Sequence, residues 1–493
     1  MMKQGVLTGL LALSAAVADQ RPNLVFLMTD DQASWTLGCY GNPDVQTPNI
    51  DQLSRDGMRF DHHYDTTAIC MASRATVMTG LYEYKTGCNF KHGNLVSGSW
   101  KKSYPVLLRD AGFRTAFAGK FGFHVNEAPE AKKGAMPEED FDVWAGGPGQ
   151  TSYATEKNPA LKKYVEEYPH STLAYGAFGS DFIKESAAAG TPFCLSISFK
   201  ASHRPVKPDP RFDDVYKGKC FSKPANFGRG HGEHFSKQSR QGRQYPRFEE
   251  WHYHDNYDEV MAKYNQQVYG VDVAVGMIRA ALKECGADKN TVIIYTSDNG
   301  FLCGSHGYGS KVLPYEESSR VPMIVYDPRH PNSGKGLCSF ALTGNVDFAP
   351  TMLNLAGVPV PASMDGSNLM KLYDNPEAEI HNALPLINVW GPKEAQSLAV
   401  VTKTHKYIYW YYGGEGFEPA EELYRIDKDR LELTNLAQQP EQKAVLEKMR
   451  KQYDGQLGRW QDQAVEYNRY DPFGVLFDRA QPWSKKAPLV KDF

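Results

Sequence analysis

The sequence Asn23-Leu24-Val25-Phe26-Leu27-Met28-Thr29-Asp30-Asp31 begins as an unbroken apolar run and ends abruptly in polar residues. An apolar run of this length without polar alternation predicts a β-strand that is buried on both faces. Further segments of strand character lie at 114–118, 192–199, 290–296 and 321–326. Helical patterns lie between them, at 104–111 and 257–285. This alternation predicts an α/β fold with a large, mainly parallel sheet sandwiched by helices.

Polar clusters follow the predicted strands at the point where each strand ends. The first is Asp30-Asp31, and the later ones are Gly119-Lys120, the segment 200–205 and Ser297-Asp298-Asn299-Gly300. In open α/β sheets, binding and catalytic groups gather beyond the carboxyl ends of the strands. We therefore expect the functional residues of this chain to come from these clusters.

The pattern of polar and apolar residues changes after Pro361. Segments 398–401 and 406–412 alternate in the manner of exposed antiparallel strands, and 439–456 has the pattern of a charged helix. We expect a catalytic α/β domain over residues 19–370 and a smaller C-terminal α+β subdomain with a tail over 371–493.

The N-terminus has the features of a secretory signal peptide. Lys3 precedes an apolar run from Val6 to Ala18, and Ala16-Val17-Ala18 gives a small-x-small cleavage pattern. We expect residues 1–18 to be removed and the mature protein to be secreted or periplasmic. The run is too short for a stable transmembrane span. No later stretch is long and apolar enough to suggest stable membrane insertion.

The charge and composition of the chain limit the kinds of binding partner that we expect. The chain has 493 residues and a formal net charge of −3, so nothing in the charge balance points to nucleic acid or a membrane surface. Its eight cysteines are widely scattered, and we expect no complete disulfide framework, with one or two unassigned bridges left open in an oxidising compartment.

Asp30-Asp31 and Asp298-Asn299 are two polar pairs, each directly after a predicted buried strand. Three carboxylates and an amide oxygen form an all-oxygen set that suits a hard divalent cation, Ca²⁺ or Mg²⁺. The alternative is that each pair caps a helix or solvates a turn. Because two pairs follow strands in the same way, we favour the metal site.

Cys70-Met71-Ala72-Ser73-Arg74 opens a segment of small and apolar residues that is typical of the first turns of a helix. A thiol at a helix N-terminus, with Arg74 one turn further on, lies in a positive field that would stabilise an anion. The alternative is a buried structural cysteine, which is the usual environment of a free cysteine.

Taken together, these motifs resemble the type I, formylglycine-dependent sulfatases of the alkaline-phosphatase superfamily. Cys70 to Arg74 is similar to the signature C-x-[PA]-x-R, with alanine at position 72. The resemblance covers residues 21 to about 436. Its other motifs, in chain order, are residues 21–31, 47–53, 297–300, 304–307 with Lys311, 315–322 and 345–357. The resemblance implies an alkaline-phosphatase-like fold and a sulfuric ester hydrolase.

The resemblance also implies a cofactor and a partner. In this family a maturation enzyme oxidises the signature cysteine to formylglycine, and the hydrated aldehyde attacks the sulfate sulfur beside a divalent cation. The metal set carried over to this chain is Asp30, Asp31, Cys70, Asp298 and Asn299. Arg74 would hold the nucleophile and Lys120 and Lys311 the sulfate oxygens. His203 would be the general acid for the leaving alcohol.

His124 is the expected base that deprotonates the hydrate, and it marks a departure from the family pattern. The common pattern is G-K-x-H, whereas this chain reads Gly119-Lys120-Phe121-Gly122-Phe123-His124. The inserted Gly122 would have to loop the backbone so that the imidazole still reaches the site. The alternatives for the base are His62, His63 and His306.

The expected substrates are O-sulfated carbohydrates, with mucin O-glycan, glycosaminoglycan and algal polysaccharide fragments all open. Segment 224–257 holds basic and aromatic side chains that would contact an anionic sugar or form a solvated loop. Two other functions compete with the sulfatase: a phosphonate or phosphodiester hydrolase of the same superfamily, and an inactive glycan-binding homologue.

Overall fold

The computed structural model describes residues 21–131 and 133–490, so the predicted signal peptide lies outside the described part. Its largest sheet has eight strands in the order β11-β2-β10-β9-β1-β8-β5-β7. The strands are β1 (Asn23–Thr29), β2 (Met58–Phe60), β5 (Arg114–Lys120), β7 (Val143–Gly147), β8 (Phe193–Ser198), β9 (Thr291–Ser297), β10 (Met323–Tyr326) and β11 (Leu337–Ser339). Only β10 runs antiparallel to its neighbours. The prediction of a mainly parallel sheet is confirmed.

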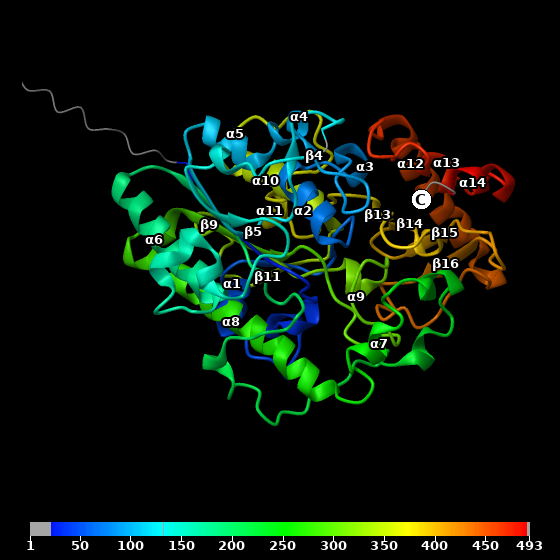
Figure 1. Cartoon of the computed structure of the whole chain (residues 1–493), viewed down its shortest axis with the longest axis horizontal. Helices are drawn as coiled ribbons and strands as arrows, with labels where there is room; N and C mark the ends of the chain where they lie inside the picture. The colour runs from blue at the N-terminus through cyan, green and yellow to red at the C-terminus, as the bar shows by residue number, and fades with distance from the viewer. Residues whose placement is uncertain (1–20, 132, 491–493) are drawn as a thin grey trace, which may run out of the picture.

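The alternation of side chains along β1 explains why its sequence is apolar throughout. Val25 and Leu27 point to one face, where they pack on α1 (Pro48–Asp56), α6 (Ser171–Ala189) and α8 (Tyr257–Glu284). Leu24, Phe26 and Met28 point to the other face and pack on α2 (Cys70–Thr79), α5 (Tyr104–Asp110) and α10 (Phe348–Leu355). Figure 1 shows these two helix layers on opposite sides of the sheet.

A second sheet near the C-terminus contains four antiparallel strands in chain order. They are β13 (Leu384–Asn388), β14 (Ser397–Val401), β15 (Lys406–Trp410) and β16 (Ala420–Tyr424), followed by the long helix α12 (Lys443–Gln463). In Figure 1 this part, yellow to red, lies beside the larger sheet. A smaller α+β part is therefore present, while the exact division at residue 370 stays a prediction.

The prediction that these C-terminal strands are exposed on one face is wrong. Every residue of β14 and β15 is buried. Tyr407 and Tyr409 face Tyr453 of α12, with ring centroids 5.4 and 6.0 Å apart from it. On the opposite face, Trp410 packs 6.5 Å from Tyr315, which belongs to the larger part of the chain. The sequence of these strands alternates although both faces are buried. Large amphipathic rings lie on one face, and a segment distant in the chain covers the other.

Shorter elements complete the described part. Two small parallel pairs are formed by β3 (His63–Tyr64) with β12 (Thr343–Gly344) and by β4 (Leu95–Val96) with β6 (Val125–Asn126). The short α-helices are α3 (Glu83–Thr86), α4 (Ser97–Trp100), α7 (Arg247–Glu250), α9 (Glu316–Ser319), α11 (Lys371–Asp374), α13 (Phe473–Leu476) and α14 (Trp483–Val490). All eight cysteines lie in the described residues and are free.

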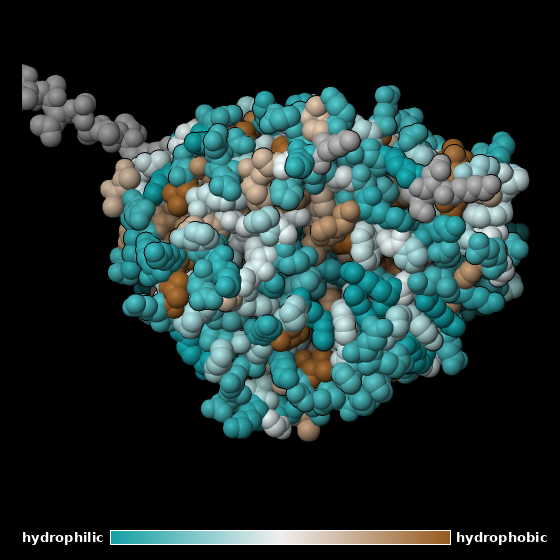
Figure 2. Space-filling model, in the orientation of Figure 1, coloured by the Kyte–Doolittle hydropathy of each residue, from teal (hydrophilic) through white to brown (hydrophobic). Residues whose placement is uncertain are grey.

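The surface is mostly polar on the face viewed in Figure 2, where hydrophobic residues form only small, separate patches. Among residues 21–131 and 133–490, no helix combines the length and the apolar character needed to cross a lipid bilayer.

Candidate active site

The carboxyl ends of four neighbouring strands bring the predicted site residues together. β1 pairs in parallel with β9 and β8, and β8 pairs in parallel with β5, so these four strands end side by side. Nine side chains meet at this edge, and we call them the Cys70 cluster: Asp30, Asp31, Cys70, Arg74, Lys120, His203, Asp298, Asn299 and Lys311.

Cys70 is the first residue of α2, and its side chain is buried at the centre of the cluster. Its Sγ donates to Asp30 Oδ1 at 3.3 Å and accepts from Lys311 Nζ at 2.6 Å. Burial, together with the charges of Asp298 and Asp30, raises the pKa of the Cys70 thiol to about 12. The expectation that the helix N-terminus stabilises a thiolate is therefore wrong, because burial and two carboxylates outweigh the nearby cations.

Arg74 lies one turn along α2 and is fully buried. Its Nε donates to Asp298 Oδ2 at 2.8 Å, and its Nη2 lies 2.7 Å from the same oxygen. Its Nη1 donates to the carbonyl of Lys120 and to the hydroxyl of Ser198, the last residue of β8. Arg74 thus ties the ends of three strands to the helix that carries Cys70.

Asp30 is the carboxylate with the most cations around it. Burial alone would raise its pKa, but Lys120, His203 and Lys311 hold the pKa well below its usual range. Lys120 Nζ donates to Asp30 Oδ2, and Lys311 Nζ donates to Asp31 Oδ1 and lies 3.7 Å from Asp30 Oδ1. Asp30 is therefore ionised and able to serve as a metal ligand.

The donor set fits a divalent cation. Ligand atoms of Asp30, Asp31, Cys70 and His203 lie within 4.8 Å of one another. Asn299 Nδ2 donates to Asp31 Oδ1 at 2.8 Å, while the buried Asn299 Oδ1 has no hydrogen-bond donor. An orphaned buried carbonyl oxygen beside carboxylates is the arrangement expected of a hard-cation ligand.

The charges of the cluster also suit an anionic substrate. Its three carboxylates are balanced by the three cationic side chains Arg74, Lys120 and Lys311. A bound divalent cation would leave a net positive centre, which favours a sulfate ester over a neutral group.

His203 follows β8 and stands at the open side of the cluster. Its Nε2 lies 3.8 Å from Asp31 Oδ2, and its side chain is 19% exposed, whereas that of Asp31 is 3% exposed. Burial lowers the pKa of His203 below its usual value, although Asp30 and Asp31 oppose the shift. Because its side chain is partly exposed, the imidazole of His203 would reach a leaving group that extends into solvent.

His124 lies outside the hydrogen-bond network of the Cys70 cluster. It is half-buried just before β6, and in the described part of the chain no hydrogen bond or ion pair joins it to the nine residues. The alternative histidines have other hydrogen-bond partners: His62 contacts Arg430, His63 contacts Thr343, and His306 contacts Asn226. The role of His124 as base stays a prediction.

Gly122, the residue inserted relative to the family pattern, lies against Arg74. Gly122 has φ +93°, and a Cβ built on it would lie 2.5 Å from Arg74 Cδ. The flanking Phe121 and Phe123 turn away into the aromatic core, with ring centroids 4.4 Å apart. No local feature of the sequence indicates this close approach, because it joins residues that lie far apart in the chain.

We expect Gly122→Ala to lower kcat/KM by about 100-fold, because the added methyl displaces Arg74 and a small misplacement of a catalytic group is costly. Gly112→Ala is the matched control. Gly112 has φ +85° but nothing lies within 4 Å of its added Cβ, so that variant carries similar backbone strain without contact to the cluster. Steady-state kinetics and thermal unfolding of both variants check this; equal activity losses in the two would contradict it.

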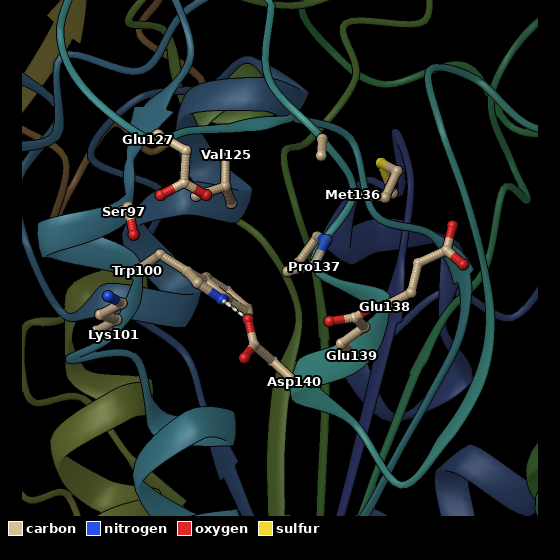
Figure 3. A pocket seen from close by; sticks show the side chains of 11 residues that line it. Ser97, Trp100, Lys101, Val125, Glu127, Met136, Pro137, Glu138, Glu139 and Asp140 are labelled. Carbon is tan, nitrogen blue, oxygen red and sulfur yellow. Dashed lines mark hydrogen bonds between the residues drawn. The ribbon is translucent and has the colours of Figure 1, made fainter.

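One well-formed pocket lies away from the cluster. It has a volume of about 500 Å³ between α4 and the segment 135–140, and Figure 3 shows Glu127, Glu138, Glu139 and Asp140 among its lining residues. Trp100 Nε1 donates to Asp140 Oδ2 at 2.6 Å across its wall. Four carboxylates with one lysine would repel a sulfated ligand, so this pocket does not compete with the Cys70 cluster as the sulfate site.

The family is decided by a comparison with family models: the sulfatase model matches residues 22–358, about two thirds of the chain. The chain belongs to the sulfatase family. It is a sulfuric ester hydrolase, as the sequence motifs implied. A second model, for the C-terminal part of N-sulphoglucosamine sulphohydrolase, matches residues 304–457 of this sulfatase.

Three similar proteins illustrate the range of the fold. An N-acetylglucosamine-6-O-sulfatase of Bacteroides thetaiotaomicron is 29% identical, over 88% of this chain and 87% of the relative. A solved structure of an enzyme with its substrate D-glucosamine-2-N,6-O-disulfate has a TM-score of 0.72 and 25% identity, covering 91% of this chain and 99% of that one. A phosphonate monoester hydrolase of Agrobacterium radiobacter has a TM-score of 0.68 at 20% identity, with 90% and 96% covered, and shares the fold.

Proposed function

We propose that this sulfatase removes sulfate from O-sulfated carbohydrates, with formylglycine made from Cys70 and a divalent cation, Ca²⁺ or Mg²⁺. The observation that carries the proposal is the Cys70 cluster, where Cys70 Sγ lies 3.3 Å from Asp30 Oδ1 and 2.6 Å from Lys311 Nζ. Carbohydrate as the substrate class is supported by relatives such as the N-acetylglucosamine-6-O-sulfatase and an ulvan-active sulfatase of Formosa agariphila.

Each residue of the cluster has a proposed task. Asp30, Asp31, Asp298 and Asn299 would hold the cation, whose chemistry is to neutralise sulfate oxygens and activate the nucleophile at position 70. Arg74 orients that nucleophile, and Lys120 and Lys311 turn from the carboxylates to the sulfate oxygens. His203 donates a proton to the oxygen of the departing sugar.

The maturation and location of the enzyme complete the proposal. A formylglycine-generating enzyme would act on Cys70 before the chain folds, because the folded thiol is 1% exposed and out of reach of a partner protein. Export through the signal peptide 1–18 would make the enzyme secreted or periplasmic, where polymeric glycans are available.

The deciding experiment is a substrate screen on protein produced together with a maturation enzyme. Defined sulfated mono- and disaccharides are compared with a phosphonate monoester and with a phosphodiester, and released sulfate or phosphonate is measured. Release from at least one sulfated sugar, with a kcat/KM above that for either phosphorus ester, supports the proposal. A higher kcat/KM for a phosphorus ester would favour the other hydrolase function, and no turnover of any compound by modified enzyme would favour the inactive homologue.

We expect removal of divalent cations to lower the melting temperature of this sulfatase, and added Ca²⁺ to restore it. A ligand that binds only the folded chain stabilises it by about 2.7 kcal/mol at 100 times its Kd. The Asp298→Asn variant is the control, because it lacks one proposed ligand and should respond less. Thermal unfolding with chelator, with Ca²⁺ and with Mg²⁺ tests this; identical melting temperatures in all three would count against a cation site.

A further inference from the structure

Three arginines stand around the open side of the Cys70 cluster: Arg204, Arg243 and Arg247. Within the described part of the chain, none of them forms an ion pair with a carboxylate. Other basic residues of the segment 224–257 are already engaged, since Arg229 pairs with Glu249 and Arg240 donates to the Glu233 carbonyl. Arg243, Arg247 and Arg204 therefore differ from Arg229 and Arg240, whose guanidinium groups are already bound by other groups of the protein.

Arg243 is connected to the nucleophile through Trp390. The guanidinium lies 4.1 Å from the centroid of the Trp390 ring. Trp390 in turn packs on a small apolar cluster. The cluster contains Ile69, which directly precedes α2, Ala72 in the first turn of α2, and Val312, which follows Lys311. Arg243 is thus held beside the entrance to the cluster by an aromatic ring, with its charge free to meet a ligand.

Arg247 and Arg204 share a second aromatic support. Each guanidinium lies 4.4 Å from the centroid of the Trp251 ring. Arg247 Nη1 also donates to Ser310 Oγ at 3.0 Å, one residue before Lys311, and Arg204 directly follows His203. The two arginines therefore approach the cluster from the sides of the proposed sulfate-binding lysine and of the proposed general acid.

The electrostatics of these arginines favour the binding of an anion. Burial lowers the pKa of Arg243, against the pull of Asp31 and Cys70. Burial also lowers the pKa of Arg247 to about 10, and the charges of Arg243 and Arg204 contribute to the shift. Arg243 and Arg247 repel each other, and the carboxylates that act on Arg247, Glu250 and Asp31, form no ion pair with it. An anion that binds between the two guanidinium groups relieves that repulsion.

We propose that Arg243 and Arg247, supported by Arg204, form a subsite for a second anionic group on the substrate, a sulfate or a carboxylate, next to the sulfate ester that is cleaved. This inference rests on the proposed function. The aromatic residues Trp251 and Trp390 serve to position the guanidinium groups, which can bind a sulfate or carboxylate through two parallel hydrogen bonds.

The test compares sugars that differ by one negative charge. The probes are N-acetylglucosamine 6-sulfate, D-glucosamine-2-N,6-O-disulfate and a disaccharide of a uronic acid with 6-sulfated N-acetylglucosamine. Binding is measured by calorimetry on a Cys70→Ala background, which needs no turnover, and kcat/KM is measured on the modified enzyme. The matched control is Arg240→Gln, a change of the same type in the same segment away from the entrance.

The Cys70→Ala protein with its arginines intact should bind at least one doubly charged probe more tightly than the singly charged one. Arg243→Gln and Arg247→Gln should each weaken that binding by about 10- to 100-fold, with the singly charged probe changed less than about threefold. Arg240→Gln should change neither. The disulfate and uronate arms distinguish the second sulfate from the carboxylate.

Two results would overturn the inference: no preference for either doubly charged probe in the Cys70→Ala protein with its arginines intact, or equal losses on singly and doubly charged probes in the arginine variants. A failure of the proposed function looks different. In that case turnover is absent for every sulfated sugar, while the binding comparison still reports whether the subsite exists.

Discussion

Replacing Cys70 with alanine should lower kcat/KM for sulfate ester hydrolysis by more than about 1,000-fold, because the change removes the atom on which the nucleophile is built. The rest of the cluster remains tied together without it: Arg74 still bridges to Asp298 at 2.7 Å, and Asn299 still donates to Asp31 at 2.8 Å. The free energy of unfolding should therefore change by only about 1 kcal/mol, as for a small buried truncation.

Cys194→Ala is the matched control for this prediction. Cys194 is also a buried free cysteine, but it lies in β8 among core side chains such as Phe117 and Phe113. The control should lose a similar amount of stability and keep its activity. Kinetics on the substrate found in the screen, combined with denaturant unfolding, separate the two effects. Residual activity of Cys70→Ala within tenfold of the native enzyme would refute Cys70 as the source of the nucleophile.

Mass spectrometry of the peptide that contains Cys70 adds an independent measurement. Conversion of a cysteine to formylglycine replaces the thiol by an aldehyde, so the modified peptide has a smaller mass. An unmodified peptide in fully active protein would rule out formylglycine while leaving the requirement for Cys70 intact.

The cluster could be predicted largely from the sequence because its residues lie at ends of strands. The apolar run of β1 fixes where Asp30 emerges, and β9 does the same for Asp298. In a parallel sheet such ends share one edge, so position along the chain translates directly into position in space.

What could not be predicted depends on contacts between distant segments. Nothing local in the sequence says that Gly122 lies against Arg74, or that the free arginines 243 and 247 approach the cluster while Arg229 turns to Glu249. The burial of β15 was missed for the same reason, since Tyr315 lies almost one hundred residues before Trp410. Periodicity reports the spacing of side chains along one element but not what covers them.

The second large effect concerns stability at the junction between the two sheets. Lys406, the first residue of β15, is fully buried, and its Nζ lies 2.8 Å from Glu316 Oε1 and 2.8 Å from Glu432 Oε1. We expect Lys406→Met to lower the free energy of unfolding by about 3–5 kcal/mol, the usual cost of leaving buried carboxylates without their cation. Glu316 keeps a second cation, Arg320, at 3.0 Å, so most of the cost falls on Glu432 and is largest above pH 8, where that carboxyl is ionised.

Lys403→Met is the control, because Lys403 lies three residues before Lys406 but makes an exposed ion pair, with Glu377 at 3.3 Å. A surface pair of this kind contributes about 1 kcal/mol or less. Denaturant unfolding of both variants measures the difference. Equal stabilities would show that the Lys406 contacts contribute no more than a surface pair.

The pH dependence tests the same junction without disturbing Lys406. Burial raises the pKa of Glu432 in the folded state to about 8, although Lys406 opposes the rise, whereas a glutamate in the unfolded chain titrates near 4.5. Between these values the folded state binds more protons, so the contribution of Glu432 to stability falls as the pH rises. Glu432→Gln, which stays neutral, should therefore gain stability relative to the native chain from pH 5 to pH 8. A constant difference across this range would mean that Glu432 is already ionised in the folded protein, and that Lys406 neutralises both carboxylates.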